Sequence, residues 1–145
     1  MNNKINQIEE YFRKNGLKLT NQRKAVVGKM LAIRSHLTVD QITDMLKNNG
    51  YVISRATVYR ILSIMKKGKF IDEHDFNQKK KYYESALGKV HHDHIFCMGC
   101  GKIVEFHNDN IEKLQDEIIK KCKFVAIYHS HKIFGYCQNC QKNTI

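Results

Sequence analysis

Two Cys-x-x-Cys pairs constrain the fold of this chain more than any other feature of its sequence. The pairs begin at Cys97 and Cys137, and 36 residues separate them. Each pair can present two sulfurs to one ion from a tight turn, and two pairs complete a tetrahedral tetrathiolate site. A thioredoxin-like redox motif needs only one pair at the start of a helix. We therefore predict a structural Zn(II) site made of Cys97, Cys100, Cys137 and Cys140.

The composition excludes several classes of protein. The chain has 145 residues, a formal net charge of +11 and 42% hydrophobic residues, so it can build a core. No apolar run approaches the ~18–20 residues that span a bilayer, and the first ten residues lack the apolar stretch of a secretory signal. Five cysteines without an export signal favour the reducing cytosol. These features predict a soluble cytoplasmic protein with no membrane partner.

The charge is unevenly distributed along the chain. Residues 1–84 hold 17 basic and 8 acidic residues, whereas residues 85–145 hold 8 and 6. The second part also contains all the cysteines and six of the eight histidines. We therefore predict two domains with different roles, a basic domain over 1–84 and a domain rich in metal ligands over 85–145.

The first domain has the pattern of a winged helix-turn-helix. Thr20, Thr38 and Ser54 each precede an apolar pattern of helical spacing, and Thr38 with a glutamine three residues later matches a capping box. Two strands, Phe70–Phe76 and Lys79–Tyr83, are expected to follow and to form the wing. Three or four helices followed by a hairpin is the element order of this DNA-binding fold.

The helix that follows Ser54 is the candidate recognition helix. Its apolar residues recur on one side, which leaves Arg55, Tyr59 and Arg60 on the other. Arginine can contact guanine edges or phosphates, and tyrosine the thymine methyl group or the backbone. Lys18 and the run Lys79–Lys81 are candidate phosphate contacts. The alternatives are an ordinary solvated helix face and a zinc-stapled RNA-binding module.

The second domain is predicted to be a small α/β unit, so the whole chain belongs to the mixed α/β (α+β) class. A strand is expected over Lys102–Phe106 and a helix capped by Asp109, with Cys122 buried on its apolar face. Phe124–Tyr128 and Lys132–Tyr136 are expected to be strands, or one bent strand. A unit of about 60 residues is marginally stable alone, which favours dimerisation through its apolar surface.

The run His91-His92-Asp93-His94 is the second metal-binding signal. In an extended segment alternate side chains point to opposite faces, so His92 and His94 would serve one site and His91 and Asp93 another. Histidine and carboxylate ligands suit Zn, Fe, Mn, Co or Ni. The alternative is a polar loop with accidental histidines. Further candidate ligands are His36, Glu84, Glu105, Glu112 and His129, although Glu112 could simply cap its helix.

Several segments together resemble the ferric uptake regulator family. The stretch from His91 to Phe106 is similar to its signature, Ala56–Arg60 to its recognition helix and Gly16–Thr20 to its amino-terminal DNA-contacting turn. Phe134–Cys137 and the closing CxxC pair resemble its carboxy end. The similarity runs in order over nearly the whole chain.

The resemblance implies a set of roles by position. It implies DNA contacts by Lys18, Tyr59 and Arg60 and a structural zinc on the four paired cysteines. It implies a sensory metal site that takes ligands from both domains and a separate site within the second. The sensory ligands would be His36, Glu84, His92 and His94, with Glu105 as an occasional further ligand; those of the additional site would be His91, Asp93, Glu112 and His129.

Taken together, the sequence predicts a metal-dependent repressor that senses Fe(II) and binds palindromic double-stranded DNA as a homodimer, with tetramers as an alternative. Within the family the alternatives are a peroxide sensor and a zinc or manganese sensor, and Mn, Co or Zn could substitute for iron. Glu84 and Arg60 favour iron, since peroxide sensors usually carry aspartate and asparagine there. A zinc metalloenzyme is a remote alternative, because no HExxH motif supplies a general base. The segment between Glu84 and His91 is one residue longer than in typical iron sensors.

Overall fold

The computed structural model describes residues 2–142 and divides into two compact units. One unit ends at Lys89 and the other begins at Val90. The predicted domain boundary lies slightly earlier, after Glu84. Within the described residues, no helix combines the length and apolar character needed to cross a membrane.

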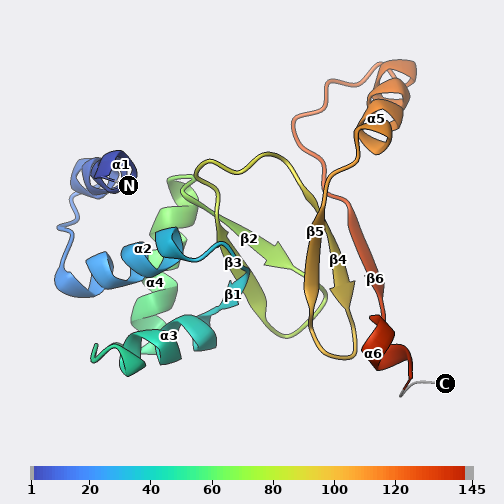
Figure 1. The fold of residues 1–145 in the computed structure, drawn as a ribbon. Helices are drawn as coiled ribbons and strands as arrows, with labels where there is room; N and C mark the ends of the chain where they lie inside the picture. Colours follow the sequence, from blue (N-terminus) through green and yellow to red (C-terminus); the bar gives the residue numbers. More distant parts are fainter. Residues whose placement is uncertain (1, 143–145) are drawn as a thin grey trace. The chain divides into compact units, whose positions relative to one another are not determined.

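The first unit is a winged helix-turn-helix, as its pattern predicts. Its helices precede and flank a sheet of three short strands in the order β1-β3-β2 (Figure 1). Both strand pairs of this sheet are antiparallel. The elements are α1 (Asn2–Lys14), α2 (Asn21–Ala32), β1 (Leu37–Thr38), α3 (Val39–Asn48), α4 (Arg55–Lys67), β2 (Ile71–Asp75) and β3 (Lys81–Ser85).

Side-chain caps fix where three of these helices begin. The Oγ1 atom of Thr20 accepts from the backbone N–H of Arg23, and Ser54 caps α4 through the N–H of Thr57. Thr38 and Gln41 form the predicted capping box: the Gln41 N–H donates to Thr38 Oγ1 at 3.3 Å, and the Thr38 N–H donates to Gln41 Oε1 at 2.9 Å. These bonds satisfy N–H groups that the first helical turn cannot pair internally.

Most of the buried apolar residues lie in the first unit. Along α4, Val58, Ile61, Leu62 and Met65 are all 2% exposed or less and join one hydrophobic cluster with α1, α2 and α3. The opposite face of α4 is exposed, as the periodicity predicts. The core therefore fixes which side of α4 faces solvent.

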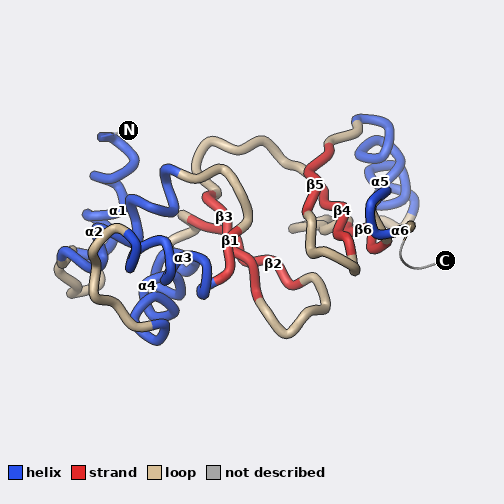
Figure 2. The backbone as a smooth tube through the Cα atoms, turned by 60° about the horizontal axis from the view of Figure 1, so that its bottom comes forward, coloured by secondary structure: helices blue, strands red, loops and turns tan. Residues whose placement is uncertain are grey.

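The second unit has a three-stranded sheet in the order β5-β4-β6, with one antiparallel and one parallel pair. Figure 2 shows its strands in red and its two helices, α5 and α6, in blue. Its central strand β4 is paired to β6, which comes from much later in the chain. The elements are β4 (Asp93–Cys97), β5 (Ile103–Phe106), α5 (Asp109–Lys121), β6 (Lys132–Gly135) and α6 (Gln138–Gln141).

Three expectations for the second unit are wrong in this structure. Phe124–Tyr128 is irregular rather than a strand, because within the described chain it pairs with no other strand. Asn108, not Asp109, caps α5, since its side chain accepts from the N–H groups of residues 110 and 111. Cys122 is exposed and ends α5 instead of packing in a core.

Apolar side chains of this unit remain in contact with solvent in the single chain. As described, α5 has no buried residue, and Leu114 and Ile118 are 59% and 60% exposed. Phe124, Val125, Ile127 and Tyr128 are between 75% and 98% exposed. Contiguous apolar surface of this kind marks an interaction site, which agrees with the predicted dimerisation role.

Candidate metal centres and DNA-contacting surface

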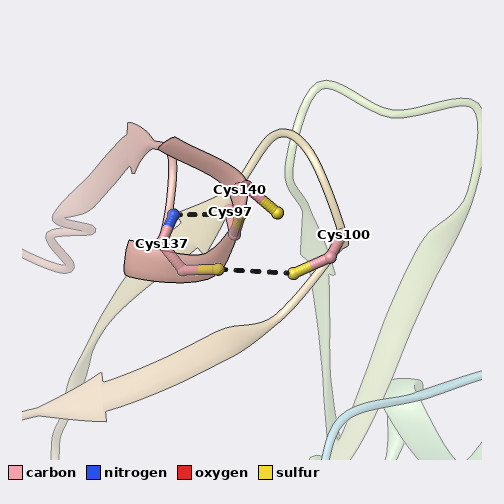
Figure 3. Close-up of side chains that lie close together, drawn as sticks. All are labelled: Cys97, Cys100, Cys137 and Cys140. Atoms are coloured by element: carbon pink, nitrogen blue, oxygen red, sulfur yellow. Dashed lines mark hydrogen bonds between the residues drawn. The ribbon is translucent and has the colours of Figure 1, made fainter. Parts of the chain in front are cut away.

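The four paired cysteines converge at one end of the second unit. Cys97 ends β4, and Cys137 precedes α6, so two distant segments each supply two sulfurs (Figure 3). The four Sγ atoms lie within 4.8 Å of one another, and those of Cys100 and Cys137 are 3.7 Å apart. A tetrahedral Zn(II) ion with bonds of about 2.3 Å separates its sulfurs by about 3.8 Å. The cluster therefore has the dimensions and donor type of a tetrathiolate zinc site.

Backbone N–H groups near the cluster favour the negatively charged thiolate form of Cys97. The N–H of Cys137 donates to Cys97 Sγ at 3.2 Å. Backbone N–H groups of Cys137 and Cys100 lower the pKa of Cys97 to about 6. In contrast, the neighbouring thiols Cys137, Cys97 and Cys100 raise the pKa of Cys140 to about 12. Four thiolates this close need a cation to neutralise them, which a divalent metal provides.

Gly99 allows the two cysteine turns to approach. A Cβ added at Gly99 would lie 2.9 Å from both Cβ and Sγ of Cys140. A side chain at position 99 would therefore displace one sulfur of the cluster. Glycine is the residue that this close approach requires.

A second cluster, of histidines and carboxylates, forms near the start of β4, whereas the cysteines gather at its end. His91, Asp93, Glu112 and His129 offer donor atoms within 4.8 Å of one another. Nε2 of His91 lies 3.4 Å from Asp93 Oδ1 and 3.4 Å from Glu112 Oε1, and Nε2 of His129 lies 3.4 Å from Glu112 Oε2. The structure thus brings together all four residues that the resemblance assigns to the additional site. Glu112 faces these histidines and does not cap its helix.

Two carboxylate oxygens of this cluster are suited to contact a cation. Asp93 Oδ2 and Glu112 Oε1 are buried and accept no hydrogen bond from the residues that the structure describes. Desolvated carboxylate oxygens without donors are costly unless a cation contacts them. His131, which had no assigned role, places Nδ1 3.7 Å from Asp93 Oδ2.

His92 and His94 lie as the alternation along an extended strand predicts. The rings of His92 and His94 are 4.9 Å apart, and Nε2 of His92 lies 3.8 Å from Glu105 Oε2. His94 is buried and pairs with Glu105 in the β4–β5 register. His92, His94 and Glu105 therefore form a third group of donors in this unit. His107 lies outside it and contacts Asp109 at 2.9 Å.

The first unit contains its own group of donors around the buried carboxylate of Glu84. Nε2 of His36 lies 3.4 Å from Glu84 Oε1, and Nε2 of His74 lies 2.7 Å from the same oxygen. The Lys89 ammonium donates to the other oxygen, Oε2. His74 was not among the predicted site residues. No signal in the sequence identified it, because Glu84 lies beyond the predicted strand Lys79–Tyr83 and the observed register of β2 with β3 is what makes His74 its diagonal neighbour.

The predicted DNA-contacting residues lie on exposed parts of the first unit. Arg55, Tyr59 and Arg60 occupy the exposed face of α4, and Lys18 is exposed in the turn before α2. Arg55 is also held by an acidic side chain, since its Nε lies 2.7 Å from Asp40 Oδ1 of α3.

The basic run of the wing is likewise constrained by carboxylates. Lys81 Nζ lies 2.9 Å from Glu73 Oε1, and Lys80 Nζ lies 4.0 Å from Asp40 Oδ2. Lys81 therefore already neutralises a glutamate, and the phosphate contacts of this run stay a prediction.

Known proteins with this combination of features belong to one family. The model of the ferric uptake regulator family matches residues 14–134. The chain is 37% identical over 139 residues to the ferric uptake regulation protein of Helicobacter pylori, covering 96% of this chain and 92% of that protein. A solved structure of the H. pylori ferric uptake regulator, described as having three functional metal-binding sites, matches with a TM-score of 0.90 at 36% identity, covering 97% of this chain and 93% of that chain.

A further solved structure, the ferric uptake regulator of Francisella tularensis with iron, matches with a TM-score of 0.80 at 31% identity. That match covers 87% of this chain and 96% of the other. Both sequence and fold therefore agree over almost the full length of the relatives. The chain belongs to the ferric uptake regulator family and is a metal-responsive, DNA-binding transcriptional regulator rather than an enzyme.

Proposed function

We propose that this regulator is an Fe(II)-dependent repressor that acts in the cytoplasm as a homodimer on palindromic operator DNA. The observation that carries the proposal is that each unit holds an incomplete group of ligands of the type that binds Fe(II). His36 and Glu84 lie 3.4 Å apart in the first unit, and His92, His94 and Glu105 form a group in the second. Imidazole and carboxylate donors together suit Fe(II) and related ions.

The regulatory step follows from the division of these ligands between the units. An ion that takes His36 and Glu84 from one unit and His92 and His94 from the other is bound best in one relative arrangement of the two. Metal binding would then favour the arrangement that spaces two recognition helices for successive major grooves. The ion supplies only the shared coordination; the DNA contacts are made by Lys18, Arg55, Tyr59 and Arg60.

The other two donor clusters have supporting roles in this proposal. The four cysteines hold a structural Zn(II), which stabilises the second unit directly, since a metal that binds only the folded state adds its binding free energy to folding. His91, Asp93, Glu112 and His129 hold an additional ion within that unit. Regulators of this family form dimers, and the exposed apolar residues of α5 and the 124–128 segment supply surface for that contact.

Iron is favoured over other metals by the relatives, because the H. pylori protein is named for ferric uptake and the F. tularensis structure contains iron. The donor types alone suit several metals. The test is operator affinity measured anaerobically at buffered concentrations of Fe(II), Mn(II), Co(II) and Zn(II), with metal content determined alongside. Fe(II) should activate binding at the free concentration at which it fills the sensory site. Activation by Zn(II) or Mn(II) alone, with Fe(II) inert, would assign a different sensor.

A further inference from the structure

A third potential metal ligand, His74, lies in the first unit beside His36 and Glu84 of the proposed sensory site. In the β1-β3-β2 sheet, Glu84 lies on the central strand, and the antiparallel register of β1 with β3 extends to place His36 opposite it. On the other side, β2 pairs Asp72 with Glu84 and His74 with Tyr82. Residues two apart on a strand share a face, so His74 and Glu84 are diagonal neighbours on one side of the sheet. The sheet therefore delivers one donor from each of three neighbouring segments.

The side-chain geometry agrees with this register. Nε2 atoms of both His36 and His74 approach Glu84 Oε1, at 3.4 and 2.7 Å. The two imidazole rings lie 5.3 Å apart, and the ring of Phe76 stacks on His74 with centroids 5.9 Å apart. The side chains of His36, His74 and Glu84 are 5%, 16% and 1% exposed. These contacts hold both rings against a carboxylate that is largely withdrawn from water.

Two imidazoles and one carboxylate form the ligand set that many non-haem Fe(II) proteins use, with the remaining positions open. An ion with bonds of about 2.1 Å separates adjacent donors by about 3–3.5 Å. The His36–Glu84 distance already has this value, and the His74–Glu84 distance must open by less than about 1 Å. Lys89 contacts the other oxygen of Glu84 and leaves Oε1 directed at the imidazoles.

The geometry points to a metal site completed by His74 within residues 1–89, which binds a divalent transition metal with His36, His74 and Glu84 before the second unit adds ligands. This inference rests on the proposed function, since His36 and Glu84 belong to the proposed sensory site. It adds an ordered sequence to that function: the DNA-binding unit captures the ion, and the second unit then completes its coordination. His74 is thus a metal ligand and not merely a hydrogen-bond partner of Glu84.

The experiment uses the full-length zinc-loaded chain and Co(II), whose visible absorption reports coordination. A background variant, Glu112→Gln with His129→Ala, removes two ligands of the additional site so that its Co(II) does not obscure the measurement. In this background, His92→Ala with His94→Ala removes the histidines that the second unit would contribute. We expect about one Co(II) per chain to remain bound in that variant. Adding His74→Gln should lower the Co(II) affinity by more than the ~10–100-fold that loss of an outer-shell partner costs, because glutamine can still donate to Glu84 but replaces the imidazole ligand.

The matched control is His107→Gln, which changes an exposed histidine outside the triad and should leave Co(II) binding unchanged. Circular dichroism and retained structural zinc establish that each variant is folded. Two results would overturn the inference: no Co(II) binding after His92→Ala and His94→Ala, or equal binding with and without His74. The proposed function is judged separately, by metal-activated operator binding in the background variant, which should persist whether or not His74 is a ligand. Where the alanine pair fails to fold, His74→Gln in the background alone must change the Co(II) absorption bands, and unchanged bands count against the inference.

Discussion

The Nε2 atoms of His91 and His129 lie 2.8 Å apart, although 38 positions separate the two residues along the chain. One comes from just before β4, and the other from the segment between α5 and β6. The two nitrogens lie at hydrogen-bond distance, and they would have to separate to about 3–3.5 Å to bind one cation. The carboxylate of Glu112 lies 3.4 Å from Nε2 of each ring. Its oxygens add metal-ligating atoms beside both nitrogens, which favours a cation at this position.

Asp93→Ala should empty this additional site with only a partial effect on DNA binding. The change removes a buried carboxylate oxygen that no described residue hydrogen-bonds. We expect the loss of about one divalent ion per chain, retained structural zinc and a modest decrease in metal-activated operator affinity. Metal analysis and fluorescence anisotropy with operator DNA measure both quantities. Unchanged metal content in Asp93→Ala would count against this site.

Cys137→Ser should release about one zinc per chain and destabilise the dimer. Removing one thiolate breaks the closed tetrahedral site, and the zinc binding free energy no longer contributes to folding. Zinc content, thermal unfolding and sedimentation check the three consequences. Cys122→Ser is the matched control, since Cys122 lies outside the cluster and should change none of them. A Cys137→Ser chain with full zinc and full thermal stability would defeat the tetrathiolate assignment.

The hinge mechanism makes a distinct prediction for His94→Ala. Because the sensory ion joins the two units only when both supply ligands, loss of the His94 imidazole should abolish metal-activated DNA binding even where the first unit retains the ion. The cysteine site and the fold should remain intact. Operator titrations with and without Fe(II), together with zinc analysis, separate these effects. His107→Ala should respond to Fe(II) like the unaltered chain. A full Fe(II) response in His94→Ala would rule the mechanism out.

The DNA surface predicts different behaviour for a base-reading and a phosphate-contacting residue. Tyr59→Ala should weaken operator binding by roughly 1–3 kcal/mol. Lys18→Ala should also weaken it, and the slope of log affinity against log salt concentration should fall by about one. Binding curves at several salt concentrations give both values. Lys113→Ala, in exposed α5, is the charge-matched control. Operator affinity unchanged in both test variants would place the DNA contact elsewhere.

The ion pairs of Glu73 predict a pH-dependent contribution to stability. Burial alone raises the pKa of this carboxyl, but hydrogen bonds from Lys66, Lys81 and Tyr83 outweigh burial and lower the pKa to about 2. Because the folded-state pKa lies below the unfolded value of 4.5, the stabilisation is present above pH 4.5 and disappears as the pH falls towards 2.

Glu73→Gln should therefore lower the free energy of unfolding by about 1–3 kcal/mol near neutral pH. The difference between the two chains should shrink steadily below about pH 4.5. Urea unfolding followed by circular dichroism at a series of pH values measures it. A difference that stays constant from pH 7 to pH 3 would show that the ion pairs contribute nothing through this titration.

Local patterns predicted the first unit well because its helices carry their own boundary signals. Thr38 and Gln41 specify where α3 begins from four residues of sequence, and the apolar spacing of α4 decides which face is exposed. The strand expected at Phe124–Tyr128 failed for a physical reason: its apolar residues suit a sheet, but the described residues of this chain supply no neighbouring strand for it. His74 was missed because its closeness to Glu84 depends on the strand register, which a ligand motif in the sequence does not encode.

The pairing of β4 with β6 bears on how the protein is made. Its two strands leave the ribosome at different times, and the last cysteine of the zinc cluster follows β6. Since domains generally fold from the amino terminus during synthesis, the winged helix can acquire its structure while the second unit still lacks a strand and two thiols. A nascent chain arrested before Cys140 would thus carry a folded DNA-binding domain and a second unit whose zinc site is incomplete. Closure of the metal cluster is therefore the last step of assembly, since it requires a chain synthesised through Cys140.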